Sequence, residues 1–353
     1  MLPAPPLPPA DLDLILARTR ELWAEARGQR FLITGGTGFF GRWLLESFCH
    51  VNDALQLGLH ATVLTRDPAR FAVRAPHLAA RADLEFIAGD VRTFVPPAGP
   101  FPYLIHAATT ASAQLNDEAP DEMFDVIVAG TRHVLDCAAC SGTKKLLLTS
   151  SGAVYGRQPP ELTHIGEAYA GAPDPLAPGT AYGLGKRVAE HLCAEHARRQ
   201  GGEAKIARCF AFVGPHLPLD AHFAIGNFIR DGLAGGPIRI QGDGTPCRSY
   251  LYAAELAVWL WTILFRAPSG RAYNVGSGES VTIRETAEAV ARAFPTPPAV
   301  MVAQAPVPGR PPARYVPEIR RAETELGLRV EIPLDDAIRR TIGWLRTGRG
   351  GGL

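Results

Sequence analysis

The sequence has almost no net charge, no patterned cysteines and no apolar run near the length of a membrane span. Its 353 residues include 36 Lys and Arg against 35 Asp and Glu. No basic stripe therefore points to nucleic acid, and no acidic tail points to a solvating segment. Residues 1–9 lack the basic start and apolar core of a secretory signal. We therefore expect a soluble, cytoplasmic protein with no nucleic-acid or membrane partner.

The six cysteines are scattered, and only Cys137 and Cys140 form a C-x-x-C. This pair falls in a helix-like segment without a second pair or a His cluster, whereas zinc needs four well-placed ligands. We expect no metal site and reduced thiols. With 46% apolar and 20% charged residues, the chain is typical of a globular protein with one large domain or two smaller ones.

Residues 34–41, Thr-Gly-Gly-Thr-Gly-Phe-Phe-Gly, are the most informative stretch. They follow an apolar run and precede a helix-like segment. A strand, a glycine turn and a helix in this order form a phosphate cradle, here with the variant spacing G-x-x-G-x-x-G. An ordinary glycine turn is the alternative. The residues that we predict to bind the cofactor here are Gly35, Thr37, Gly38, Phe39, Phe40 and Gly41.

Strand-like and helix-like segments alternate from residue 31 onward. The expected strands are 31–33, 61–65, 84–88, 103–106, 145–149 and 204–208, and the expected helices are 42–50, 121–139 and 180–200. This alternation predicts an α/β fold of the Rossmann type, a doubly wound parallel sheet with helices on both faces.

After residue 214 the segments become shorter, and Pro and Gly become frequent. We expect a smaller C-terminal α/β lobe that binds the substrate, with helices at 227–234, 254–265 and 283–294 and strands at 238–240 and 273–275. His164, His216 and His222 are expected in solvated loops near its cleft. The predicted division is an N-terminal extension (1–29, a loose proline-rich lead and an amphipathic helix at 11–27), a dinucleotide-binding domain (mainly 30–213), the lobe (mainly 214–346) and a flexible tail (347–353).

Tyr182 and Lys186 form a Y-x-x-x-K. Positions i and i+4 share one face of a helix, so Lys186 can place its ammonium near the Tyr182 ring and a cofactor ribose. A nearby Lys⁺ and a positively charged nicotinamide both favour the phenolate, and we expect Tyr182 to act as a general acid and base. Ser151 follows a buried strand, where open α/β sheets bind ligands. It is expected to hydrogen-bond a substrate oxygen, although a capping role is the alternative.

With these features in this order, the chain resembles the extended short-chain dehydrogenase/reductase superfamily, in its nucleotide-sugar epimerase/dehydratase branch, over residues 30–345. The resemblance also includes segments 89–91, 106–109, 242–244, 248–250 and 273–278. It implies an NAD(P) cofactor, a nucleotide-diphosphate sugar substrate and a homodimer paired through the helices at 121–139 and 180–200. It also implies catalytic roles for Ser151, Tyr182 and Lys186, cofactor contacts from Asp90, Val91, Ala107, Ala108 and Thr109, and substrate contacts from Asn227, Arg248 and Arg310.

The chain departs from the family after Ser151. Sugar-nucleotide 4,6-dehydratases usually carry an Asp-Glu pair there and UDP-glucuronate decarboxylases usually keep the Glu, whereas Gly152 and Ala153 cannot transfer protons. We therefore predict a 4-epimerase or a 4-keto reductase and place a 4,6-dehydratase or decarboxylase second. A non-catalytic NAD(P)-binding sensor or scaffold is a further alternative. Ala211, where the family often has a substrate-binding Asn, is a candidate substrate contact.

The second expected strand ends at Thr65 and is followed by Arg66 and Asp67. NAD-binding members usually end this strand with an Asp that accepts a hydrogen bond from the ribose. Thr65 is neutral, and Arg66 can pair with a 2′-phosphate or stack on adenine. The pattern favours NADP(H) over NAD(H), although Asp67 stands only two residues late.

Overall fold

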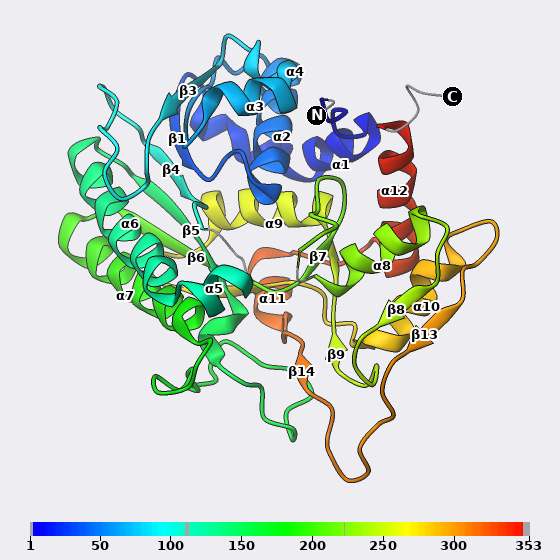
Figure 1. Cartoon of the computed structure of the whole chain (residues 1–353). Helices are drawn as coiled ribbons and strands as arrows, with labels where there is room; N and C mark the ends of the chain where they lie inside the picture. Colours follow the sequence, from blue (N-terminus) through cyan, green and yellow to red (C-terminus); the bar gives the residue numbers. More distant parts are fainter. Residues whose placement is uncertain (1–2, 110–112, 222, 349–353) are drawn as a thin grey trace.

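The structure is a computed structural model that describes residues 3–109, 113–221 and 223–348. At its centre is a parallel sheet with the strand order β11-β6-β5-β4-β1-β2-β3 (Figure 1). Its strands are β1 (Arg30–Thr34), β2 (His60–Thr65), β3 (Leu84–Ala88), β4 (Tyr103–His106), β5 (Lys145–Ser151), β6 (Glu203–Cys209) and β11 (Ala272–Val275). The predicted Rossmann-type α/β fold is confirmed, and the six strands predicted before residue 213 are present.

The strand order determines where a ligand can bind. The chain runs from β1 to β2 and β3 on one side and then returns to β4 on the other side of β1. Open α/β sheets bind ligands at such a reversal, in the crevice outside the carboxyl ends of the strands. Thr34 at the end of β1 lies opposite His106 at the end of β4. The glycine turn after β1 therefore lies beside the segment that follows β4.

Alternate residues of the strands face two helical layers. Phe31 and Ile33 belong to the hydrophobic cluster that includes α2 (Phe39–Leu55) and α9 (Ala253–Arg266). Leu32 belongs to the cluster that includes α6 (Pro120–Cys140) and α7 (Ala181–Gln200), which lie side by side in Figure 1. Because both faces of the sheet are buried at its centre, β1, β4 and β5 carry continuous apolar runs rather than alternating patterns.

The C-terminal lobe is built from small sheets and short helices. β8 (Ile238–Ile240) pairs with β13 (Val300–Val302), β7 (Phe212–Val213) pairs with β10 (Leu251–Tyr252), and β9 (Cys247–Arg248) lies between β12 (Val281–Thr282) and β14 (Arg314–Tyr315). Its helices are α8 (Ala224–Leu233), α10 (Ile283–Arg292), α11 (Arg320–Leu326) and α12 (Leu334–Thr347). Elsewhere lie α3 (Pro68–Arg74), α4 (Pro76–Ala79), α5 (Ala113–Glu118) and η2 (Gly152–Tyr155). Within the described ranges, no helix combines the length and the apolar character needed to cross a membrane.

Two elements after residue 213 belong to the sheet rather than to the lobe. β11 is the edge strand beside β6, and α9 covers β5 and β6. Trp259 and Trp261 of α9 are fully buried. Both elements follow the boundary predicted near residue 213, because neither a short strand nor an apolar helix reveals in sequence which core it joins.

The N-terminal segment packs into the core of the protein. The single helix expected at 11–27 is divided into α1 (Pro9–Thr19) and the 3₁₀ helix η1 (Arg20–Ala26). Trp23 is fully buried, with its ring centroid 4.6 Å from that of Trp261. Trp23 continues the buried face of α1, since Ile15 and Thr19 are buried at the same four-residue spacing.

The proline-rich lead is also anchored rather than loose. Leu7 is buried, and its backbone N–H donates to Glu46 at 2.6 Å. Trp344 of α12 donates to the carbonyl of Pro6 at 2.9 Å, so the start of the chain lies against its last helix (Figure 1). α12 ends at Thr347, and residues 349–353 of the predicted tail lie outside the described residues.

We predict that Trp23→Ala will destabilise the protein by about 3–5 kcal/mol, because truncating a buried Trp removes apolar contacts and leaves a cavity. The measurement is the free energy of unfolding from a urea titration followed by circular dichroism. Val95→Ala is the control, since Val95 is 84% exposed and its truncation should change stability by less than about 0.5 kcal/mol. A Trp23→Ala protein as stable as the control would show that η1 adds nothing to the core.

Candidate active site

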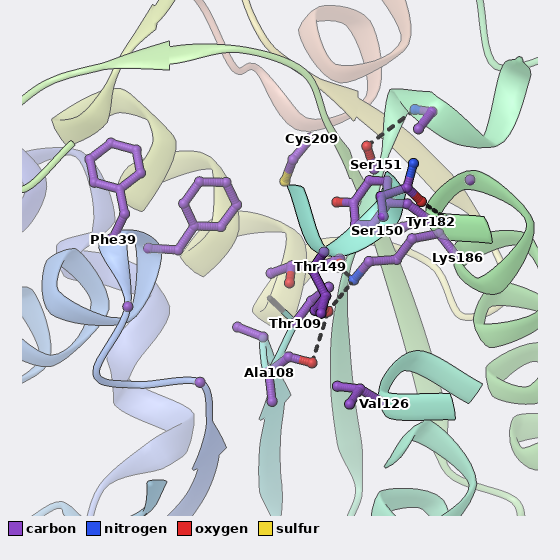
Figure 2. A pocket seen from close by; sticks show the side chains of 18 of the residues that line it. Phe39, Ala108, Thr109, Val126, Thr149, Ser150, Ser151, Tyr182, Lys186 and Cys209 are labelled. Carbon is purple, nitrogen blue, oxygen red and sulfur yellow. Dashed lines mark hydrogen bonds between the residues drawn. The ribbon is translucent and has the colours of Figure 1, made fainter. Parts of the chain in front are cut away.

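A cavity of about 1300 Å³ opens at the carboxyl ends of the sheet strands. Its walls come from the turn after β1, the ends of β2, β4, β5 and β6, helix α7 and the C-terminal lobe. Almost all site residues predicted from the sequence line it, namely Gly35, Thr37, Gly38, Phe39, Phe40, Thr65, Arg66, Asp90, Val91, Ala107, Ala108, Thr109, Ser151, Tyr182, Lys186, Ala211 and Arg248. In Figure 2, Phe39 lies on one side of this cavity, and Ser151, Tyr182 and Lys186 gather on the other.

The glycine turn has the geometry of a phosphate cradle. Gly35 has φ of 75°, and a Cβ there would lie 2.4 Å from the Ala107 carbonyl, so only glycine fits. A Cβ at Gly41 would lie 2.3 Å from Gly36; Gly41 therefore lies behind the cradle and lets α2 start against the turn. Gly38 is the N-cap of α2, and a Cβ there would meet only the Gly35 carbonyl at 3.5 Å. The N-terminus of α2 thus faces open space that suits a pyrophosphate.

The adenosine end of the cavity is rich in charge. Arg92 makes a bidentate ion pair with Asp90 at 2.7 and 2.9 Å, which lowers the pKa of Asp90 to about 2. Arg66 is exposed and lines the cavity. Asp67 lies after the strand end at which NAD-binding family members usually carry their ribose-binding Asp. It accepts from the backbone N–H of Arg70 at 2.8 Å and caps α3.

Ser151, Tyr182 and Lys186 converge, as the sequence predicts for catalytic partners. Ser151 ends β5, and its side chain hydrogen-bonds with Tyr182. Lys186 Nζ lies 5.9 Å from the centroid of the Tyr182 ring. It donates to Thr109 Oγ1 at 2.7 Å and to the Thr149 carbonyl at 2.8 Å, so the ammonium is held between α7, β5 and the segment after β4 (Figure 2).

The electrostatics correct one expectation. Removal from water raises the pKa of Tyr182 to about 12, and the hydrogen bond with Ser151 offsets this only in part. Burial also lowers the pKa of Lys186 to about 8. The sequence predicts that Lys186 lowers the pKa of Tyr182, but the largest influence on this pKa is desolvation of the phenol, and the opposing influence comes from Ser151.

The wall behind Ser151, Tyr182 and Lys186 is a buried hydrogen-bonded network. His106 contacts Thr34 Oγ1 at 2.7 Å and Thr131 Oγ1 at 3.0 Å. Burial lowers the pKa of His106 to about 3, so this histidine stays neutral. Thr34 Oγ1 also accepts from the N–H of Ala108 at 3.3 Å. The network fixes the backbone of Ala107 to Thr109, which faces the cavity.

Among the residues predicted to bind substrate, Ala211 and Arg248 line the cavity. The structure does not bring Asn227 and Arg310 to it. Asn227 Oδ1 accepts from Arg230 at 3.1 Å, and Arg310 is exposed on the loop before β14.

The three histidines expected in solvated loops have different surroundings. His164 hydrogen-bonds with the carbonyl of Gly278 at 2.9 Å, and His222 lies outside the described residues. His216 is buried beside Glu46 rather than solvated, because Trp344 of α12 packs against its ring at a centroid distance of 4.5 Å.

Other residues that line the cavity are not predicted from the sequence. Tyr315 of β14 places its hydroxyl 3.4 Å from Ser151 Oγ, and its ring lies 4.7 Å from that of Phe210. Asn116 Oδ1 accepts from the N–H of Tyr182 at 3.0 Å and so helps to start α7. Cys209 directly follows a predicted strand, and that position alone could have identified it as a residue of the cavity wall. Nothing local distinguishes Tyr315 or Asn116.

The space beside Gly152 is closed. A Cβ on Gly152 would lie 2.7 Å from both the Tyr315 hydroxyl and Phe210 Cζ. No larger side chain fits there unless one of these rings moves. The position at which the dehydratases carry the first of their two acidic residues is therefore sterically blocked, whereas Ala153 borders the cavity.

Fold and site together define a Rossmann-type dinucleotide-binding protein with the Ser, Tyr and Lys of a short-chain dehydrogenase/reductase. A family model described as the NAD dependent epimerase/dehydratase family matches residues 31–276. The chain belongs to this family.

Relatives within the family carry several activities. The chain is 28% identical to UDP-glucuronic acid decarboxylase 1 of Danio rerio, over 90% of this chain and 73% of that protein. It is similar in structure to the UDP-glucose 4-epimerase of Thermus thermophilus in complex with NAD, with 26% identity, a TM-score of 0.72, and coverage of 92% of this chain and 100% of the other. A dTDP-glucose 4,6-dehydratase of Streptomyces venezuelae has a TM-score of 0.73 at 22% identity, covering 91% and 98%; this likeness concerns the fold alone.

We predict that Gly35→Ala will abolish cofactor binding, because a Cβ at this position collides with the Ala107 backbone. Gly28→Ala is the matched control: Gly28 has φ of 69° but open space around it, so this variant carries the left-handed strain without the collision. The measurement is titration of each protein with NAD⁺ and NADP⁺ by tryptophan fluorescence. Equal affinities of the two variants would contradict the proposed cradle.

Proposed function

We propose that this chain is a nucleotide-sugar 4-epimerase or 4-keto reductase that exchanges a hydride between a sugar carbon and NAD(P). The observation that carries the proposal is the convergence of Ser151, Tyr182 and Lys186 at one end of a cavity whose other end is the glycine cradle. This is the arrangement that hydride transfer requires, with a proton-transfer group beside the dinucleotide site.

In the oxidative direction, the Tyr182 phenolate takes the proton of the sugar hydroxyl while the hydrogen on the same carbon leaves with both bonding electrons, and a ketone forms. A bound oxidised nicotinamide supplies the hydride acceptor and a positive charge that favours the phenolate. Ser151 hydrogen-bonds the reacting oxygen. In an epimerase, the hydride returns to the opposite face of the sugar carbon, and Tyr182 returns the proton to the oxygen. In a reductase, the reaction begins at the ketone and ends with an alcohol and an oxidised cofactor.

The residues of the cradle fit a dinucleotide, since Gly35 and Gly38 leave room for a pyrophosphate at the start of α2. We propose NADP(H) as the cofactor, with NAD(H) as the alternative that the family description favours. Two features support NADP(H): the exposed Arg66 at the end of β2 and the commitment of Asp67 to capping α3.

Nucleotide-diphosphate sugars are the proposed substrates, with Arg248 as the cation of the lobe wall that can pair with their phosphates. We also propose a homodimer through the helical layer of α6 and α7, on the outer side of the sheet in Figure 1. Both proposals rest on the family resemblance together with these positions.

Decarboxylation of a nucleotide-bound uronic acid is the second candidate, and sequence relatives named UDP-glucuronic acid decarboxylases favour it. Oxidation at C4 would use the same three residues and would place a ketone β to the carboxylate, so the C–C bond can break with loss of CO₂. Gly152 and Ala153, which hold no proton-transfer group, argue against this outcome.

Product analysis distinguishes these reactions. We expect the purified protein to convert UDP-glucose, UDP-galactose or a 4-keto sugar nucleotide without loss of carbon, as measured by liquid chromatography–mass spectrometry and proton NMR. An epimer keeps the mass, a reductase adds two hydrogens with stoichiometric cofactor oxidation, and a decarboxylase releases CO₂ from UDP-glucuronate. Release of CO₂ as the main reaction would favour the second candidate, whereas no turnover with intact cofactor binding would favour a sensor or scaffold.

Tyr182→Phe is the control for this experiment. It should lower turnover by about 10²–10⁴-fold, the usual contribution of a positioned acid or base, while cofactor binding survives. Because burial raises the pKa of Tyr182 to about 12 and the base must be the phenolate, the oxidation rate should rise with pH below the pKa of Tyr182 in the cofactor complex. Near-normal turnover of Tyr182→Phe would exclude the mechanism.

We predict that Arg66→Ala will weaken NADP⁺ binding by about 10–100-fold, the value of a charged hydrogen bond, and leave NAD⁺ binding nearly unchanged. Arg70→Ala is the matched control, since Arg70 is exposed on α3 and does not line the cavity. Affinities are measured by fluorescence titration. A wild-type protein that binds NAD⁺ much more tightly than NADP⁺ would reject the role proposed for Arg66.

A further inference from the structure

A second phenol approaches the catalytic serine from the C-terminal lobe. Tyr315 lies on β14, and its hydroxyl is 3.4 Å from Ser151 Oγ. Its ring rests on Phe210 with a centroid distance of 4.7 Å, so the hydroxyl is aimed at the cavity wall. At this distance the hydrogen bond is long, as catalytic hydrogen bonds often are before the substrate binds.

The hydrogen-bonding capacity of Ser151 gives this contact a direction. A serine hydroxyl has one proton to donate and two lone pairs that accept. One lone pair accepts from the N–H of Ala153 at 3.1 Å. If the other accepts from Tyr315, both lone pairs are occupied, and the single proton of Ser151 is left to donate toward Tyr182, with which Ser151 also hydrogen-bonds.

We propose that, before the sugar binds, Tyr315 is a positioning residue that donates to Ser151 and thereby commits the Ser151 proton to the Tyr182 phenolate; the reacting sugar oxygen takes over this hydrogen bond when it enters the site. The chain of donors then runs from Tyr315 through Ser151 to Tyr182, and it stabilises negative charge at its far end. The inference rests on the proposed function, in which Tyr182 must become a phenolate. It adds a residue from the lobe to a set otherwise drawn from the sheet domain.

The donor direction agrees with the surroundings of Tyr315. Burial raises the pKa of Tyr315, and negative charge on Tyr182 raises it further, so Tyr315 keeps its proton when Tyr182 loses one; the hydrogen bond with Ser151 and the charge of Arg248 only partly oppose this shift. The titratable groups that act on Tyr182 or Tyr315 include Cys209 on β6 and Arg248 on β9. Those coupled to the neighbouring Lys186 include Glu190 and Cys193 on α7 and His106 on β4. The pKa values of Cys193 and Cys209 are raised to about 12 and that of His106 is lowered to about 3. Near neutral pH these three are uncharged and do not compete with the hydroxyl chain.

Gly152 provides a second, independent observation. Because Gly152 has no Cβ, the Tyr315 hydroxyl and Phe210 Cζ can each lie 2.7 Å from the position that a Cβ would take. A side chain at residue 152 and a Tyr315 hydroxyl in contact with Ser151 therefore exclude each other. Glycine at this position is what allows the second phenol to reach the serine.

The test is a direct titration of Tyr182 in the cofactor complex, which needs no substrate. Ultraviolet difference spectra against Tyr182→Phe isolate the tyrosinate of Tyr182 with NAD⁺ or NADP⁺ bound, whichever binds more tightly. Tyr315→Phe removes one hydroxyl and keeps the ring on Phe210. We expect it to raise the pKa of Tyr182 by about one unit, the size of one lost hydrogen bond. Gly152→Ala, which pushes the Tyr315 hydroxyl away without deleting it, should act in the same direction.

Two controls keep the result specific. Tyr169→Phe removes a phenol hydroxyl that does not line the cavity and should leave the pKa of Tyr182 unchanged. In a Ser151→Ala background, Tyr315→Phe should add no further shift, because the effect passes through Ser151. An unchanged pKa in Tyr315→Phe, an equal shift in Tyr169→Phe, or a full shift without Ser151 would each overturn the proposal. Since no turnover is measured, a failure of the sugar-nucleotide assignment would be seen separately in the product analysis.

Discussion

The buried ammonium of Lys186 is the constraint on which the site depends. A charge removed from water is costly unless its hydrogen bonds are replaced, and here Thr109 Oγ1 and the Thr149 carbonyl replace them at 2.7 and 2.8 Å. These partners belong to the segment after β4 and to β5, so Lys186 ties α7 to the ends of two central strands. Tyr182 lies one turn earlier on α7, so the hydrogen bonds of Lys186 also hold Tyr182 near Ser151.

The parts of the fold that the sequence predicts well are those whose cause is local. Apolar runs bounded by polar turns mark the central strands, and Gly35 and Gly41 mark a turn in which a Cβ would collide with neighbouring backbone. The i, i+4 spacing of Tyr182 and Lys186 likewise follows from helix geometry alone. These features predict, before any long-range contact is known, that the glycine turn and the Tyr-Lys face lie at the carboxyl edge of the sheet, and there both line one cavity.

The features that the sequence does not predict depend on contacts between distant segments. Trp23 packs against Trp261, β11 joins β6 across more than sixty residues, and Tyr315 meets Ser151 from β14. No periodicity encodes these pairings. The pKa of Tyr182 is a similar case, because spacing predicts the neighbouring Lys186 but not the amount of water removed around the phenol, and it is the removal of water that dominates.

The relatives and the site bear on the reaction in different ways. The sheet, the cradle and the Ser-Tyr-Lys set serve every reaction that begins with oxidation of a sugar carbon, so similarity over the whole chain reflects the shared step. What separates the reactions is the proton chemistry after that step, and here the first two residues after Ser151 have no acidic group. Because Phe210 and Tyr315 fill the space beside Gly152, an acidic side chain at that position would require changes on β14 and after β6 as well. The identity of residue 152 is therefore coupled sterically to Tyr315 of the C-terminal lobe.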